Sequence, residues 1–192
     1  MTLLSEGSTM FFLIVLAIVI ILAGFYIGTY NAFIKNRNRV EETWAQIDVQ
    51  LKRRCDLIPN LVETVKGFAR HEQDTLEKVI AARNSIIAAG NSPQQQLEAN
   101  NQLTGALRSV FALSESYPEL KANDSFVELQ HELSTTENKV AYSRQLYNST
   151  VMNWNNRVES FPSNIIANFH HFEKTEMLSL AETERETPSV KF

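Results

Sequence analysis

Residues 10–30 read MFFLIVLAIVIILAGFYIGTY and carry no charged side chain. An α-helix rises about 1.5 Å per residue, so this run is long enough to cross the roughly 30 Å hydrocarbon core of a bilayer. Residues 1–9, MTLLSEGST, contain no Lys or Arg, whereas a cleaved secretory signal begins with a positively charged region. The sequence therefore predicts a transmembrane helix that stays attached and follows a short extracytoplasmic tail.

Three basic side chains follow the apolar run: Lys35, Arg37 and Arg39. Basic residues beside a transmembrane helix favour the cytoplasmic side of the membrane. This juxtamembrane basic group predicts a single-pass protein of the inner (cytoplasmic) membrane, with its N-terminus outside and the chain after residue 30 in the cytoplasm. The single cysteine, Cys55, agrees with a reducing compartment. A domain on the periplasmic side is the alternative.

Two glycines of the apolar run, Gly24 and Gly28, lie four residues apart. This spacing of small residues lets two transmembrane helices approach closely. We expect a transmembrane contact between copies of the chain here, although glycine is common in such helices and the pattern also arises by chance.

Residues 31–167 are expected to form one helical bundle. Apolar residues keep helical spacing from Val40 to Leu51, so the transmembrane helix is expected to continue into the bundle. Arg54 falls on the same stripe, and we expect its long side chain to reach a solvent edge. No function is assigned to it.

Pro59 interrupts this pattern, because a proline inside a helix removes a hydrogen bond and clashes with the carbonyl four residues back, that of Cys55. Asp56 could instead cap a new helix with Pro59 in its first turn. The apolar spacing resumes at Leu61 and stops at Gly90. The stretch is therefore either two helices with a corner at Pro59 or one long helix with a kink.

Two further helices follow. Ser92 and Pro93 predict the start of one that runs to Tyr117. Ser125 and Glu128 form an S-x-x-E capping box that predicts the start of the last helix. Bulky residues then recur at every seventh position, as expected for a core seam: Phe126, Leu133, Val140, Tyr147, Trp154 and Phe161.

After this helix, four apolar residues are predicted to share one face of a short amphipathic segment and to contact the membrane or a neighbouring subunit. They are Ile165, Ile166, Phe169 and Phe172. Residues 168–192 are predicted to be a polar, disordered tail.

No stretch alternates with a period of two, so the fold class is all-α. The net charge of −4 is spread over both signs and predicts no nucleic-acid partner. His71 and His131 each precede Glu but lack the second His of a zinc-protease helix. His170 and His171 point to different helix faces and are expected to be solvated. No catalytic residue, cofactor or metal ligand is predicted.

The motifs RNRV, LKRR, DLIPNLV, YPELKAN and ENKVA resemble the signature of the bacterial LemA family, and the resemblance covers residues 30–167. It implies a membrane-anchored, up-and-down four-helix bundle without enzyme activity, and it favours a corner at Pro59. It also links a magnetosome relative to membrane invagination and places HtpX-type membrane proteases and TPM-domain proteins among the expected partners.

Two functions fit these observations. In the first, anchored bundles form a homo-oligomer that scaffolds, organises or remodels the phospholipid membrane. In the second, the bundle is an adaptor that is presented to another membrane protein, such as an HtpX-type protease or a TPM-domain protein. An enzyme ranks well behind both.

Overall fold

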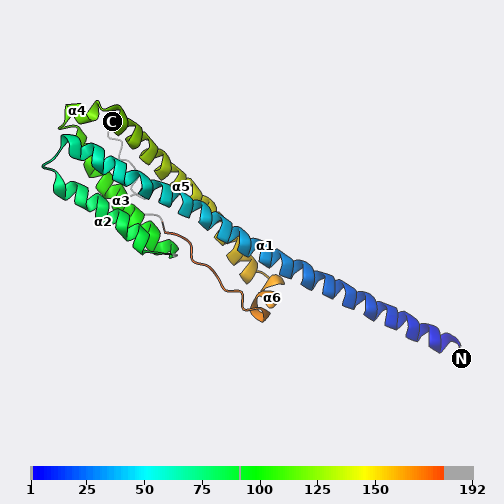
Figure 1. Ribbon diagram of the computed structural model, residues 1–192. Coiled ribbons are helices and arrows are strands. Elements are labelled where there is room, and N and C mark those ends of the chain that lie inside the picture. Colours follow the sequence, from blue (N-terminus) through cyan, green and yellow to red (C-terminus); the bar gives the residue numbers. More distant parts are fainter. Residues whose placement is uncertain (1, 91, 180–192) are drawn as a thin grey trace, which may run out of the picture. The chain divides into compact units, whose positions relative to one another are not determined.

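The computed structural model describes residues 2–90 and 92–179, with side chains from residue 9 onward. The described residues form helices and connecting segments without a strand, which confirms the all-α prediction. The helices are α1 (Thr2–Phe68), α2 (Gln73–Ala88), α3 (Pro93–Ser114), α4 (Pro118–Lys121), α5 (Asp124–Glu159) and α6 (Ser163–Phe169) (Figure 1).

Helix α1 passes through Pro59 without a break. Of the two alternatives for Pro59, the structure therefore shows one long helix, and the corner that the family resemblance favoured is wrong. Proline has no N–H to donate to the carbonyl of Cys55, and the side chain of Arg83 on α2 donates to that carbonyl instead. A hydrogen bond from another helix thus replaces the one that the proline removes, which helps the helix to continue.

The break falls ten residues later, between α1 and α2. The backbone N–H of Ala69 still donates a hydrogen bond to the carbonyl of Val65, and the N–H of Glu72 donates to the carbonyl of Ala69. The Tyr117 hydroxyl donates to the Glu72 carboxylate at 3.2 Å. Residues 69–72 include neither proline nor glycine, the residues that most clearly mark turns. The sequence therefore did not indicate a turn at this position.

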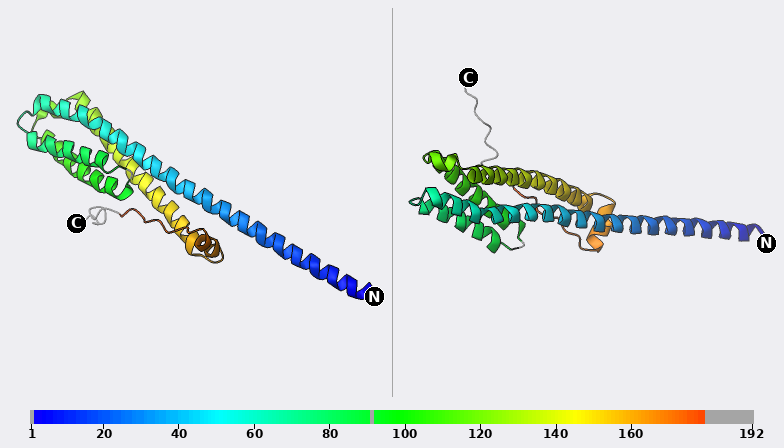
Figure 2. Two further views of the ribbon diagram at one scale, coloured as in Figure 1. Left: turned by 60° about the horizontal axis from the view of Figure 1, so that its bottom comes forward. Right: turned by 45° about the horizontal axis from the view of Figure 1, so that its top comes forward.

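The predicted end of α2 and the predicted start of α3 agree with the structure, whereas α3 ends at Ser114, three residues before the predicted Tyr117. Gly90 follows α2 with a φ of +57°, a left-handed conformation that glycine adopts without steric cost. Helix α3 begins at Pro93, and the Gln96 side-chain amide donates to the Gly90 carbonyl. Figure 2 shows α2 and α3 lying side by side.

The cap of α5 differs from the predicted one. The backbone N–H of Phe126 bonds to the Asn123 side-chain oxygen at 3.0 Å, so Asn123 caps the helix. The capping box predicts Ser125 as the N-cap, but Ser125 lies inside α5. Asparagine and serine are about equally good caps, so the sequence alone did not separate the two positions.

The chain divides into two compact units, each with its own core. The first unit comprises residues 1–41 and 149–176, and the second comprises residues 42–148 and 177–192. In the second unit, the rings of Trp44 on α1 and Tyr147 on α5 meet edge to face. The predicted seam of α5 is buried there at these positions: Phe126, Leu133, Val140 and Tyr147.

In the first unit, Phe33 of α1 and Trp154 of α5 form the centre of the core with two residues of α6, Ile166 and Ala167. Phe172 stacks on Phe33 with ring centroids 4.9 Å apart. Aromatic pairs add to the apolar area that is buried. This core fixes the short helix α6 against both long helices of the unit.

Asparagine side chains of α5 hold the segment that follows α6. Within the first unit, Asn155 donates to the carbonyl of Thr175 and accepts from its N–H, each at 2.9 Å. Within the second unit, Asn148 makes the same pair of bonds with Leu178, each at 2.8 Å. These contacts of residues 168–179 differ from the predicted disordered tail, and residues 180–192 lie outside the described part of the chain.

Candidate functional site

The apolar end of α1 is long and apolar enough to cross a bilayer, and none of its most apolar window is buried inside the structure. Its large side chains are exposed from Met10 to Ile27. A water-soluble protein rarely exposes a contiguous apolar surface of this size. This surface is therefore the first candidate site of the chain, and its length and composition suggest a membrane anchor.

The two predicted contact glycines lie on this exposed helix. A Cβ atom added at Gly24 or at Gly28 would meet nothing within 4 Å. Neither glycine is thus required for packing within the described chain. The predicted contact between transmembrane helices remains a prediction.

The juxtamembrane basic residues Lys35, Arg37 and Arg39 are also exposed on α1. Arg37 lies 3.9 Å from Glu41, one helical turn further along. An exposed pair of this kind contributes at most about 0.5 kcal/mol. The pairing of Arg37 with Glu41 therefore adds little to stability, and the role of this basic group at a membrane stays a prediction.

Helix α6 contacts α1 at the end of the apolar run. The Tyr26 hydroxyl and the His170 Nε2 atom are hydrogen-bonded at 2.7 Å. The rings of Tyr30 and His170 have their centroids 4.7 Å apart. His170 is therefore half-buried against two tyrosines, and the prediction of a solvated histidine is wrong for this residue.

The four apolar residues predicted to share one face are divided between two surroundings. Ile166 is buried and Phe172 is partly buried in the core of the first unit. Ile165 and Phe169 are exposed, four residues apart on α6. Phe161, predicted to continue the seam of α5, is exposed as well, because α5 ends at Glu159.

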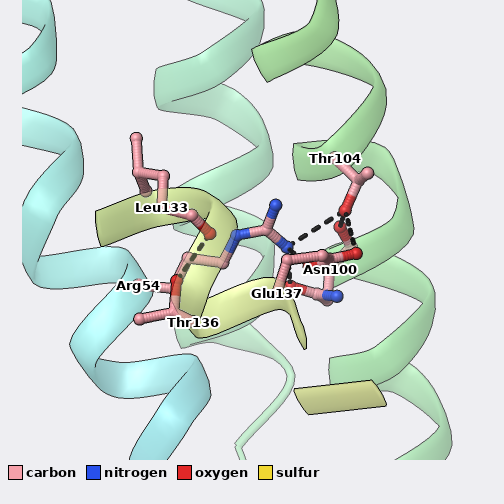
Figure 3. Close-up of polar contacts among 6 residues, drawn as sticks. All are labelled: Arg54, Asn100, Thr104, Leu133, Thr136 and Glu137. Carbon is pink, nitrogen blue, oxygen red and sulfur yellow. Dashed lines mark hydrogen bonds and ion pairs between the residues drawn. The ribbon is translucent and has the colours of Figure 1, made fainter. Parts of the chain in front are cut away.

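A second candidate site is a buried polar cluster around Arg54, in the second unit (Figure 3). The guanidinium points away from α1 toward α3 and α5, and its side chain is only 3% exposed. It donates to Asn100 at 2.6 Å and to Thr104 at 3.0 Å, and it is paired with Glu137. The predicted snorkelling of Arg54 to solvent is therefore wrong.

Burial changes the titration of this region. Desolvation lowers the pKa of Arg54 from its ordinary value, and the nearby Glu137 partly offsets this change. Burial also raises the pKa of the Cys55 thiol, against the opposing effect of Arg83. The thiol is consequently protonated at neutral pH, which is the opposite of what a cysteine nucleophile requires.

A groove of about 700 Å³ lies between α1 and α5 in the second unit. Two large apolar side chains, Val49 of α1 and Tyr142 of α5, line it and are mostly exposed. Its polar lining includes Gln46, Asn138 and Lys139. The mixture of an exposed aromatic ring with amides suits a protein contact better than bond-breaking chemistry.

No group of three or more His, Cys, Asp or Glu side chains that could hold a metal ion occurs among the described residues. The sequence had identified neither the role of Arg54 nor that of His170. Arg54 was visible as a charge on an apolar stripe, but its partners lie on helices that are distant in the sequence. The tyrosines that contact His170 are even further from it in sequence.

These features define a membrane-associated, all-helical protein whose most exposed apolar surface belongs to its first helix. A family model described as "LemA family" matches residues 43–192, and the chain belongs to this family. It is 25% identical to Protein LemA of Metamycoplasma hominis over 145 residues, which cover 74% of this chain and 65% of the relative.

Two magnetosome proteins are similar as well. MamQ of Magnetospirillum gryphiswaldense is 21% identical over 172 residues, and MamQ 2 of Paramagnetospirillum magneticum is 22% identical over the same length. Each alignment covers 77% of this chain and 63% of the relative. The chain thus spans slightly less than two-thirds of the length of these relatives.

Proposed function

We propose that this chain is a non-enzymatic, membrane-anchored scaffold that self-assembles to organise or remodel the bacterial inner membrane. The observation that carries the proposal is the continuity of α1. One helix contains the exposed apolar run and also Phe33, Ile47 and Leu51, which are buried in the cores of the two units. A contact between the anchors of two copies would therefore raise the effective concentration at which their bundles meet.

Two exposed surfaces support self-assembly. The glycine pair of the apolar run is open to a neighbouring helix, and close approach at such pairs drives association in lipid. The groove with Val49 and Tyr142 offers a second contact on the bundle. Similarity to two proteins named as magnetosome proteins is consistent with a role at a membrane.

The test is the mass of the full chain in mild detergent. We expect the wild type to form a homo-oligomer and Gly24→Leu/Gly28→Leu to form a smaller species, because leucine blocks close backbone approach and keeps the helix apolar. Ala23→Leu places a leucine on another helix face and should keep the wild-type mass. A wild type that is monomeric at every concentration would contradict the scaffold.

The groove on the second unit also favours a second function, that of an adaptor. In this function the groove would bind another membrane protein, and the expected partner is an HtpX-type protease or a TPM-domain protein. Tyr142→Ala should abolish co-purification of that partner and leave the mass of the isolated chain unchanged. If Tyr142→Ala instead reduces the mass of the homo-oligomer, the groove serves self-assembly.

The proposed orientation places the N-terminus outside and the bundle in the cytoplasm. On intact cells, an impermeant thiol reagent should label Ser5→Cys and should not label Ser116→Cys until the cells are opened. Ser116 is an exposed position of the bundle, whereas Cys55 is buried and would resist labelling on either side. The reverse pattern of labelling would place the bundle on the periplasmic side.

A further inference from the structure

Helix α6 and Phe161, two residues before it, present large apolar side chains that are mostly exposed in the described chain. Phe161 is 80% exposed, Ile165 60% and Phe169 71%. These three residues lie within nine positions of the sequence, and Ile165 and Phe169 are one helical turn apart on α6. Such a concentration differs from apolar residues scattered singly over a surface. We refer to these three residues as the α6 patch.

The position of α6 along α1 identifies what the patch faces. The hydrogen bond between Tyr26 and His170 and the ring contact of Tyr30 place His170, and with it the end of α6, beside the last residues of the apolar run. Tyrosine is enriched where hydrocarbon meets the headgroups. The first cation of α1 after the run is Lys35, just over one turn past Tyr30. Helix α6 therefore lies at the level of this boundary.

The composition of the segment agrees with this level. Residues 160–169 read SFPSNIIANF and contain no charged side chain. Charged side chains begin at Glu159 on one side and at Glu173 on the other, and Glu159 forms an ion pair with Lys174 at 2.6 Å. Serine and asparagine tolerate the headgroup layer, while the phenylalanines and isoleucine gain from contact with acyl chains.

We infer that the α6 patch is a second membrane contact, in which Phe161, Ile165 and Phe169 insert into the interfacial layer of the bilayer that α1 crosses. The core residues Ile166 and Phe172 hold α6 against α1 and α5, so the patch is presented rigidly. The contact rests on the membrane anchor of the proposed function, but it does not require self-assembly. One copy of the chain is sufficient to make it.

The test uses the full chain in nanodiscs of phosphatidylcholine and phosphatidylglycerol that hold one copy each. Ile165→Cys and Phe169→Cys are labelled with an environment-sensitive fluorophore, and the wild type shows that buried Cys55 stays unlabelled. Quenching by nitroxide lipids is compared with quenching by a water-soluble agent. Ile20→Cys in the apolar run is the lipid control, and Lys174→Cys is the water control.

We expect both α6 labels to show blue-shifted emission and several-fold more lipid quenching, relative to aqueous quenching, than the label at Lys174→Cys. Water access equal to that at Lys174→Cys would overturn the inference. Labels shielded from both quenchers would also overturn it, because protein rather than lipid would then cover the patch. If the label at Ile20→Cys were outside lipid, the anchor itself would be wrong, which separates the two failures.

Discussion

The Nε atom of Arg83 donates a hydrogen bond of 3.0 Å to the backbone carbonyl of Cys55. In an uninterrupted helix this carbonyl would accept from the N–H of residue 59, which is proline here. Arg83 lies on α2, so a side chain of the second helix supplies the donor that α1 lacks. A long helix with an internal proline thus depends on its neighbour in the bundle.

The first prediction concerns this pair. Arg83→Ala should lower the free energy of unfolding by about 1–3 kcal/mol, because a buried carbonyl loses its donor. In a Pro59→Ala background the new N–H can bond to Cys55, so the same substitution should cost less. Thermal unfolding of the full chain in mild detergent, followed by circular dichroism, measures both differences.

Lys78→Ala is the matched control, since Lys78 is an exposed cation on the same helix. Its effect should be within about 0.5 kcal/mol. Equal costs of Arg83→Ala with and without Pro59 would show that Arg83 acts through packing and not through the Cys55 carbonyl.

The second prediction concerns the titration of Cys55. Burial raises the pKa of its thiol above the ordinary value of 9.0, mainly by desolvation. The unfolded chain therefore loses this proton at a lower pH than the folded chain does. The folded protein therefore keeps its full stability below pH 9.0, where the thiol is protonated in both the folded and the unfolded chain. It loses stability as the pH rises through the folded-state pKa.

We expect the thermal stability of the wild type to decline from about pH 9 upward, and Cys55→Ala to remove the first part of this decline. Tyr147, whose pKa burial also raises, accounts for a later part that begins near its ordinary value of 10.0. At pH 8, a thiol reagent should react far more slowly with the native protein than with the urea-unfolded protein. Equal rates would mean that Cys55 is accessible in solution.

The sequence predicted the class of the fold but not every boundary, and the difference has physical causes. Gly90 and Pro93 mark helix ends through their own backbone preferences, so local reasoning located them. Pro59 also has a strong local preference, yet a hydrogen bond from Arg83 allows α1 to continue. A contact between residues far apart in sequence thus decided against the expected corner.

The candidate sites follow the same division. The apolar run of α1 was predictable because length and composition alone determine it. The burial of Ile166 and the exposure of Phe169 were not predictable, since both residues are apolar and only the packing of α6 distinguishes them. The surroundings of Arg54 likewise depend on α3 and α5, which the pattern around residue 54 does not reveal.

The third prediction concerns the segment after α6. Asn155→Ala removes two hydrogen bonds to the backbone of Thr175, so amide hydrogen exchange of residues 173–176 should become faster. Asn153→Ala, an exposed asparagine on the same helix, should leave the exchange unchanged. Mass spectrometry of peptides from the full chain provides the measurement. If exchange in this segment is already fast in the wild type, the contacts do not persist in solution.

The last prediction compares two neighbouring ion pairs of α1 and α5. Arg54 is buried and paired with Glu137, whose side chain is 32% exposed. Arg53 is half-exposed and lies 2.6 Å from Glu132. Removing one partner of a buried pair leaves an uncompensated charge and costs about 3–5 kcal/mol, whereas an exposed pair contributes about 0–1 kcal/mol.

Glu137→Gln should therefore destabilise the bundle several times more than Glu132→Gln, by about 2 kcal/mol once the partial exposure of Glu137 is taken into account. Adding Arg54→Met to Glu137→Gln should recover part of this loss, because the unpaired buried charge is then gone. Raising the salt concentration to about 1 M should abolish the small effect of Glu132→Gln and leave that of Glu137→Gln nearly unchanged, since salt screens exposed charges far better than buried ones. Thermal unfolding in detergent measures all four stabilities, and equal effects of the two glutamate substitutions would mean that water reaches Arg54.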